Sequence, residues 1–283
     1  MSKTDGLKSS GFGMDTAAVK FSATEDLGGG MSINGYMTAA SLARGNTVGG
    51  EDMGIALMGG FGKLFMGQIE IGSGIRGLGQ AGAPVNNMEG EVLSAAVNSD
   101  IIKYTSPKFS GMTFSGSFTE GTEVIGGAAT GDVLGLGTGI KTAGVKNASS
   151  ITLGIDYAAG PMAAKLDISN WSDSTKDSRY RLAGAYDLGM AKLGLGFERT
   201  KYNTGINNKQ TILGVSAPIG AAVTVGAVWA QNKPSVGAKV SGTTLGVQYD
   251  LSKRTNVTAN TSSWKTAGLA SDSKTTVLLN HNF

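Results

Sequence analysis

The sequence predicts an all-β fold, a transmembrane antiparallel β-barrel of sixteen strands, fifteen of them legible. Three observations predict it. Residues alternate between two faces with period 2 in runs of roughly 8 to 12 residues, which is the spacing of β-strands. The connections between these runs alternate between short and long. In addition, one face of each run is apolar, and this many strands would enclose a lumen that is too wide for side chains to fill.

Fifteen runs share the alternation, and in this interpretation residues 1–283 form a single barrel. Helical spacing of apolar residues is sustained nowhere, although Met88–Val97 could form a short helix within a loop. In chain order the predicted strands are Thr16–Thr24, Met31–Ser41, Asp52–Gly59, Lys63–Gly72, Asp100–Ser106, Met112–Glu120, Ser150–Ala158, Met162–Trp171, Ser178–Leu188, Ala191–Tyr202, Gln210–Ala217, Ala221–Gln231, Thr243–Leu251, Asn256–Trp264 and Thr275–Phe283.

The two faces differ chemically, as the run Met162–Trp171 illustrates. Leu166 and Ile168 lie on one face, whereas Lys165 and Asp167 lie on the other. A soluble barrel would place the apolar face inside, but its wide lumen would remain unfilled. Apolar residues outside and polar residues inside resolve this conflict, and lipid makes that arrangement favourable. The alternation therefore predicts a membrane barrel with a water-filled interior.

The connections form two classes. Tight turns such as Phe61–Gly62 and Gly189–Met190 alternate with longer loops along the chain. A meander with tight turns at one rim and long loops at the other produces this rhythm, whereas a β-sandwich would not. The long loops are Ala43–Glu51, Ser73–Ser99, Gly121–Ser149, Ser172–Asp177, Asn203–Lys209, Asn232–Val240 and Lys265–Lys274.

An odd number of legible strands raises the question of how the barrel closes. The last run ends at Phe283, and the final strand of a membrane barrel must pair to close the sheet. Bacterial single-chain barrels have even strand counts. Either Thr4–Met14 contributes a poorly patterned strand, or a first strand is missing from this sequence. A parallel seam between the first and last strands is the third option and the least favoured.

The composition excludes several classes of protein. The 45 Gly show no three-residue period, which argues against collagen, and no apolar run has the length of a transmembrane helix. Without Cys, the chain can form no disulfide and no thiolate metal site. A net charge of +3 is too small to indicate nucleic-acid binding. Met1–Asp5 lacks the apolar segment of a secretory signal, so an outer-membrane protein would have a processed or recombinant start here.

No combination of residues predicts catalysis. His281 is the single His and lies two residues from the end, which gives a catalytic triad or a zinc site no support. Gly72–Gly77 matches G-x-G-x-x-G, but no core-facing helix follows it. We therefore expect no enzyme and no cofactor. Calcium binding at the turns Glu25-Asp26 or Glu51-Asp52 is an unspecific alternative.

Several segments carry motifs that occur together, in this order, in one known family. The segments are Ser9–Phe12, Val19–Met31, Leu57–Gly67, Ser99–Met112, Arg179–Gly189 and His281–Phe283. They span nearly the whole chain, and Glu-Asp-Leu-Gly-Gly-Gly and Tyr-Thr-Ser-Pro are the more specific elements. In these segments the chain resembles the Gram-negative porin family, specifically the general diffusion porins of the beta-proteobacterial type.

This resemblance implies a sixteen-stranded homotrimeric diffusion channel of the bacterial outer membrane, with its third extracellular loop folded into the lumen. Ser73–Ser99 has the position of that constriction loop. The pores of the family often favour anions. Arginines that the family usually carries on the second strand and after the fourth-strand glycine are replaced here by Ala18, Ser22 and Gln68. We therefore expect only a weak anion preference.

Charged side chains select ions where they project into a narrow lumen, because water screens them less there. By alternation, basic and acidic residues both lie on the inner wall, the acids including Asp156, Asp167, Asp187, Glu198 and Asp250. We predict a constriction where basic wall residues face acidic loop residues; the alternative is mutual pairing with little effect on permeation. The candidate pore-lining residues are Lys20, Glu70, Arg76, Glu89, Glu91, Lys103, Lys165, Arg179, Arg181 and Lys192, of which Lys20, Lys103, Arg179 and Arg181 would face Glu89 and Glu91.

The sequence therefore predicts an outer-membrane porin for passive diffusion of small hydrophilic solutes and ions. We expect contacts with membrane lipid and lipopolysaccharide, assembly as a homotrimer and no nucleic-acid partner. The alternative is a barrel that acts as an adhesin or structural scaffold, its lumen plugged by Ser73–Ser99 and Gly121–Ser149. An outer-membrane enzyme is a third reading with little support, given the position of His281.

Overall fold

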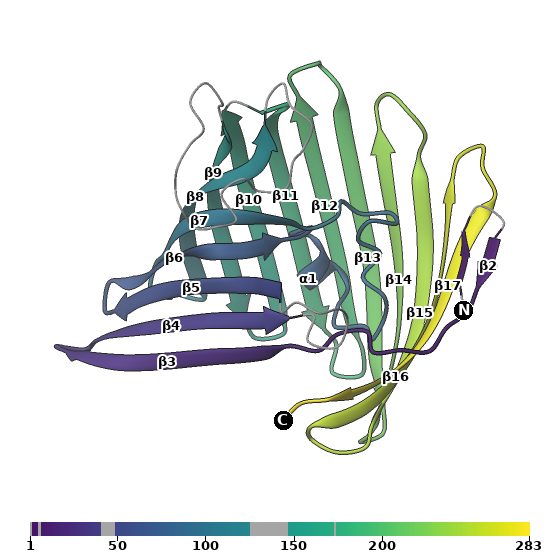
Figure 1. Ribbon diagram of the computed structural model, residues 1–283, viewed down its shortest axis with the longest axis horizontal. Coiled ribbons are helices and arrows are strands. Elements are labelled where there is room, and N and C mark those ends of the chain that lie inside the picture. The colour runs from purple at the N-terminus through teal and green to yellow at the C-terminus, as the bar shows by residue number, and fades with distance from the viewer. Residues whose placement is uncertain (1, 5–6, 41–48, 125–146, 173) are drawn as a thin grey trace.

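The computed structural model describes residues 2–4, 7–40, 49–124, 147–172 and 174–283. In these residues one antiparallel sheet contains fifteen long strands (Figure 1). They are β3 (Val19–Gly28), β4 (Met31–Ala40), β5 (Gly49–Gly59), β6 (Gly62–Ile71), β7 (Val97–Thr105), β8 (Met112–Val124), β9 (Asn147–Ala159), β10 (Met162–Ser172), β11 (Lys176–Asp187), β12 (Lys192–Tyr202), β13 (Asn207–Ile219), β14 (Val223–Pro234), β15 (Val240–Asp250), β16 (Thr255–Thr266) and β17 (Ser271–His281).

Each long strand pairs with the next one along the chain, from β3 to β17. The sheet is strongly twisted, with β3–β6 lying across the strands β12–β17, and it curves around the short helix α1 (Arg76–Gly79) (Figure 1). Twist and strand tilt are what allow an antiparallel sheet to curl toward a barrel. The predicted fold class is confirmed.

The closing strand finds its partner at the start of the chain. Two three-residue strands, β1 (Ser2–Thr4) and β2 (Leu7–Ser9), form a hairpin, and β1 pairs with the first residues of β17 through Ser2–Lys274 and Lys3–Ser273. β2 falls inside the segment predicted as a poorly patterned strand. Over the described residues, no register joins β3 directly to β17, so the parallel seam is not formed.

Residues 72–96 connect β6 to β7 inside the curve of the sheet. The predicted loop Ser73–Ser99 ends three residues too late, because Val97, Asn98 and Ser99 pair with β6. A helix forms at Arg76–Gly79 and not over Met88–Val97. There the side chains of two asparagines accept the backbone N–H groups of residues 88 and 89, a local turn that competes with helix formation.

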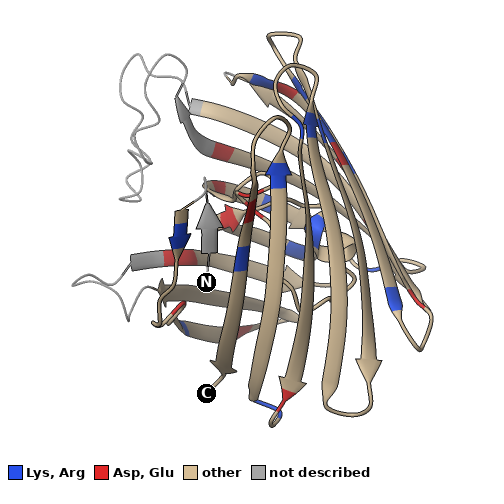
Figure 2. Ribbon diagram, turned by 90° about the vertical axis from the view of Figure 1, so that its right-hand side faces the viewer, with Lys and Arg blue, Asp and Glu red and all other residues tan. Residues whose placement is uncertain are grey.

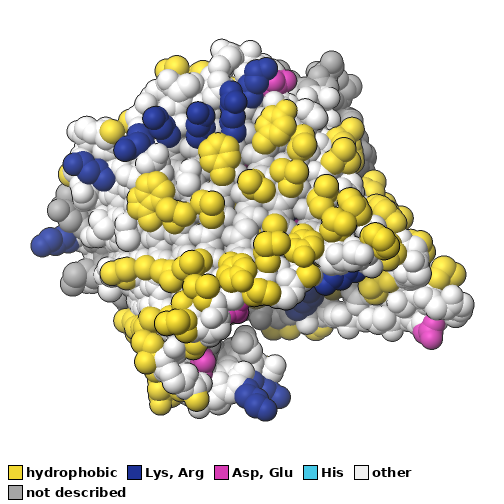
Figure 3. Space-filling view, turned by 180° about the vertical axis from the view of Figure 1, so that it is seen from behind, with side chains coloured by type: hydrophobic (Ala, Val, Ile, Leu, Met, Phe, Trp, Pro, Cys, Tyr) yellow, Lys and Arg dark blue, Asp and Glu magenta, His cyan; other side chains and the backbone are white. Residues whose placement is uncertain are grey.

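The two faces of the sheet have the polarity expected in lipid. On β12, Glu198 and Thr200 are 3% and 5% exposed, whereas Leu193 and Leu195 are 46% and 52% exposed. A soluble protein would show the reverse order. Figure 3 shows hydrophobic side chains over a broad band of the outer surface, with Lys and Arg side chains along one rim. The apolar face therefore points outward, as predicted.

Register carries this assignment around the sheet. Helix α1 contacts one face of β10–β13, which makes that face the inner one. Since directly paired residues share a face, each ladder extends the inner face to the next strand. Among the described residues, no helix is long and apolar enough to cross a membrane.

Replacing Leu195 with Lys tests the outward orientation. Leu195→Lys should lower the free energy of unfolding in lipid vesicles by about 2–4 kcal/mol, because an ammonium group would then face the acyl chains. Thr113→Lys is the matched control, since Thr113 pairs with Asp156 on the inner face of β8 and is only partly buried. Urea titration of both variants measures the effect, and an equal loss in both would contradict the assignment.

Candidate functional site in the lumen

Glycines on the inner wall admit the backbone of residues 72–96. At each of four successive strands, a Cβ added to an inner-facing glycine would overlap loop atoms. Only glycine permits such a close approach between a strand and another backbone segment. These inner-wall glycines and the residues they meet are Gly194 with Leu78 and Gly79, Gly214 with Gly79 and Gln80, Gly226 with Ala83 and Pro84, and Gly246 with Pro84 and Val85.

Apolar side chains hold the loop on this wall. Ile75 and Met88 of the loop are 0% and 1% exposed, and they belong to one buried cluster with Ile212 and Val228 of the wall. Burying apolar surface favours this arrangement by roughly 25 cal/mol per Å² removed from water. The complete cluster is Ile75, Met88, Val92, Leu93, Ala183, Ile212, Val228 and Ala230, with Leu78, Ala83, Val85, Val240 and Trp264 packed against it.

Polar contacts fix the position of the loop along the wall. The hydroxyl of Ser216 on β13 donates to the carbonyl oxygen of Ala81 at 2.5 Å. The side chain of Gln210 receives the backbone N–H of Ser94 at 3.3 Å and donates to its hydroxyl at 2.5 Å. Both wall residues are buried, so losing these contacts would leave unpaired polar groups, a cost of about 1–3 kcal/mol each.

Glu89 braces the loop internally. Its carboxylate accepts hydrogen bonds from the guanidinium of Arg76 at 2.5 Å and from the backbone N–H of Ser73 at 2.8 Å. Glu91 accepts a long hydrogen bond of 3.5 Å from Asn86. Both acids were predicted to face basic residues on the wall. Among the described residues they form no ion pair with the wall, and whether they face its basic residues across the lumen stays a prediction.

Most candidate pore-lining residues lie where they were predicted, and one does not. Arg76, Glu89 and Glu91 lie in the loop. Glu70 is wrong, because it shares the outer face of β6 with Met66 and Gln68, opposite Phe65, which packs with inner-face Ala56. The prediction placed a charge in the lumen where the register places it outside. The candidates that the register places on the inner face are Lys20, Lys103, Lys165, Arg179, Arg181 and Lys192, and their part in permeation stays a prediction.

Acidic groups of the inner wall are largely paired with cations. Arg181 donates to Glu198 at 2.5 Å, in a contact where both side chains are at most 10% exposed. Lys165 lies 3.5 Å from Asp167 and 3.8 Å from Asp156. Lys192 lies 3.8 Å from Asp187. Figure 2 shows how sparsely these charges are distributed along the strands.

Three other lysines of the inner wall lie near aromatic residues and not in ion pairs with carboxylates. The ammonium of Lys20 lies 4.1 Å from the Tyr36 ring centroid, and that of Lys63 lies 5.6 Å from the Phe65 ring. Lys103 pairs in register with Phe65 on the same face. Within the described part of the chain, these three lysines form no ion pair. The sequence analysis missed Lys63. This residue lies two positions from Phe65, so alternation with period 2 places it on the same face as Phe65 and its partner Lys103.

A cavity of about 630 Å³ lies between α1 and the short-turn ends of β9–β12. Its polar lining includes Lys108, Lys192 and Asp187, and loop residues 77, 78, 81 and 82 form its other wall. The loop therefore leaves an open space between itself and this part of the wall.

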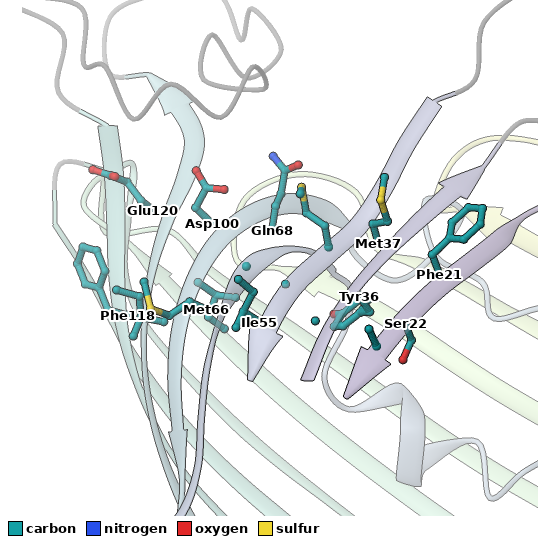
Figure 4. Close-up of a pocket in the computed structure, with 17 residues that line it drawn as sticks. Phe21, Ser22, Tyr36, Met37, Ile55, Met66, Gln68, Asp100, Phe118 and Glu120 are labelled. Carbon is teal, nitrogen blue, oxygen red and sulfur yellow. The ribbon is translucent and has the colours of Figure 1, made fainter. Parts of the chain in front are cut away.

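The outer face of β3–β8 is hollowed into an apolar groove of about 1290 Å³ (Figure 4). Met37, Ile55 and Met66 line it with exposed side chains. At one end a polar row crosses three strands, since Asp100 pairs in register with both Gln68 and Glu120. An outer face with carboxylates differs from the rest of the apolar band.

The described residues contain no group of three or more His, Cys, Asp or Glu side chains that could hold a metal ion. The polar groups described on the inner wall are fixed charges, hydroxyls and amides. Such groups can attract, orient and screen solutes.

Comparison with known proteins agrees with this geometry. The chain is 26% identical over 227 residues to an outer membrane porin protein of Bordetella pertussis, which covers 65% of this chain and 57% of that relative, so the chain spans little more than half the relative's length. Among solved structures, the anion-selective porin from Comamonas acidovorans matches 96% of this chain and 91% of its own, with a TM-score of 0.71 and 21% identity. OmpT of Vibrio cholerae in its trimer form matches 99% and 92%, with a TM-score of 0.65 and 14% identity.

The profile of the family described as Gram-negative porin matches residues 2–274, almost the entire chain. This extent confirms the resemblance seen in the sequence motifs and agrees with the sheet, the outward apolar band and the loop in the lumen. The chain belongs to the Gram-negative porin family, whose members are proteins of the outer membrane.

Proposed function

We propose that this protein forms a water-filled channel for passive diffusion of small hydrophilic solutes across the outer membrane, with a weak preference for anions. Family membership and the polar lumen support the channel. A solved structure of similar fold, named as an anion-selective porin, supports a preference for anions over cations. Neither the family nor the arrangement of side chains suggests a catalytic step.

The state of the lumen charges carries the proposal. The wall carboxylates of Asp167, Asp187 and Glu198 each have a cation within 4 Å. Lys20 and Lys103 have no such carboxylate among the described residues. Because paired charges largely cancel beyond a Debye length of about 8 Å at physiological salt, the uncompensated cations dominate the potential in the lumen. The preference stays weak, since a water-filled pore screens them.

The plugged scaffold is the alternative function. Helix α1 contacts β10–β13, and the inner-wall glycines seat the loop on β12–β15, which leaves it on one side of the barrel. A loop on one wall narrows a lumen without closing it. The second predicted plug, Gly121–Ser149, falls mostly outside the described residues.

Neutralising Lys103 tests the anion preference. In planar bilayers, single-channel currents should occur, and the reversal potential in a potassium chloride gradient should shift toward cation preference in Lys103→Gln. Glu70→Gln is the control, because Glu70 faces outward and its loss should leave the reversal potential unchanged. Absence of discrete conductance steps in the wild type would contradict the channel, and cation selectivity would contradict its sign.

Adding a side chain under the loop tests the constriction. Gly226→Val should displace residues 83 and 84 from the wall and change the single-channel conductance by about twofold or more, because the loop sets the narrowest cross-section. Ala227→Val on the outer face of the same strand is the control and should conduct as the wild type does. Equal conductance of all three proteins would show that the loop does not limit flow.

We infer that three copies associate through the outer face of β3–β8. Carboxylates facing acyl chains are unfavourable in lipid. Asp100 and Glu120 lie on this face within strands and pair with each other. Asp100 also pairs with Gln68, which lies four residues along β6 from Leu64. A neighbouring copy would cover both the polar row and the groove, and a solved fold relative is described in a trimer form.

Single cysteines test this interface, since the chain has no Cys of its own. Ile55→Cys in the groove should give cross-linked dimers with a short bifunctional reagent in lipid vesicles. Leu213→Cys, outward on β13 and similarly exposed, should not. Cross-linking of Leu213→Cys alone would place the interface elsewhere.

A further inference from the structure

The guanidinium of Arg179 is the most unusual charged group of the inner wall. It lies on β11 between the paired Arg181 and the long-loop end of the strand. Its carbon Cζ lies 4.8 Å from the ring centroid of Trp171. Its Nε atom is buried and has no hydrogen-bond partner among the described residues.

The residues that flank Arg179 do not supply that partner, since no hydrogen bond joins the described neighbours to its Nε atom. Ser169 and Thr200 flank it in register on β10 and β12. The Ser169 hydroxyl lies 2.8 Å from that of Thr152, and the Thr200 hydroxyl donates to Glu198 at 3.2 Å.

The nearest carboxylates are also occupied. Glu198 accepts from Arg181 at 2.5 Å, and Asp167 lies 3.5 Å from Lys165. Arg179 therefore keeps both its charge and a buried donor. A buried charged group without a partner is costly, and such groups recur where a ligand completes the site.

The guanidinium itself indicates which ligand could complete the site. It lies over the Trp171 ring, and its planar fork of N–H donors can still bind a second partner. Two parallel N–H groups match two oxygens of a carboxylate or a phosphate. A halide has a single centre and gains less from this fork.

The position of Arg179 places it beside the constriction. The next inward residue of β11, Arg181, contacts the loop at Gly74, where an added Cβ would lie 2.8 Å from Nη1. Arg179 is two residues further toward the long-loop rim. A solute entering from that rim would meet Arg179 immediately before the narrowed segment.

We propose that Arg179, with its guanidinium over the Trp171 ring, forms an oxyanion-binding station at the long-loop side of the constriction, which holds carboxylate or phosphate groups in preference to chloride. The proposal takes from the proposed function only that anions enter this lumen. It adds a saturable site of defined geometry to a diffuse positive potential.

Trp171 provides a direct readout, because an anion bound at the guanidinium changes the environment of its ring. Titration of the detergent-solubilised wild type with inorganic phosphate should change its tryptophan emission saturably, and acetate should do the same if carboxylates share the site. Sodium chloride at equal ionic strength should give no saturable change. The Trp171→Phe variant should lose the signal and thereby assign it.

Two variants separate geometry from charge. Arg179→Lys keeps the positive charge but lacks the fork, so the half-saturating phosphate concentration should rise about tenfold. Arg199→Lys makes the same exchange at an exposed position on the outer face of β12 and should keep the wild-type half-saturation within about twofold, since it leaves the fork of Arg179 intact. Three results would each overturn the proposal. They are an unchanged half-saturating phosphate concentration in Arg179→Lys, an equal response of the wild type to chloride, and the absence of any saturable response in the wild type.

The channel and the station can fail separately. Saturation of the emission in a protein that gives no conductance would retain the station and reject diffusion through the lumen. Anion-selective conductance without saturation would retain the channel and reject the station.

Discussion

Backbone hydrogen bonding in a medium without water is the constraint on which the rest of this molecule depends. Every strand must give its N–H and C=O groups to neighbours, and the antiparallel ladders between successive strands from β3 to β17 are where this happens. The same ladder fixes which side chains share a face. Once one face of β12 touches the loop, the inward position of residues as distant as Lys20 follows from pairing alone.

The lumen has two chemically different walls. The strands β12–β15 carry glycines and a buried apolar cluster, and they receive the loop. The strands β3–β7 carry Lys20, Lys63 and Lys103 beside aromatic rings. A passing ion would therefore have a structural wall on one side and uncompensated positive charge on the other. Selectivity in this arrangement depends on which charges remain unpaired more than on how many there are.

The fold and most of the inner wall were predictable from the sequence, because alternation with period 2 is a local property. Lys165, Arg179, Arg181 and Lys192 all lie inward as their runs predict. Pairing partners were not predictable. The sequence does not show that Glu89 pairs with Arg76 of its own loop. Glu70 was predicted to face the lumen, but its register places it on the outer face. The closure at Ser2 and Lys3 also escaped prediction, since three-residue strands carry no pattern.

The close contact between the loop backbone and four glycines has a consequence for how the protein could evolve. A glycine codon is one base change from codons for several larger residues. Gly194, Gly214, Gly226 and Gly246 each lie close to a different part of the loop. In the proposed channel, the exclusion limit would therefore be a trait that point mutation can adjust, while the sheet and its anchorage in the membrane remain intact.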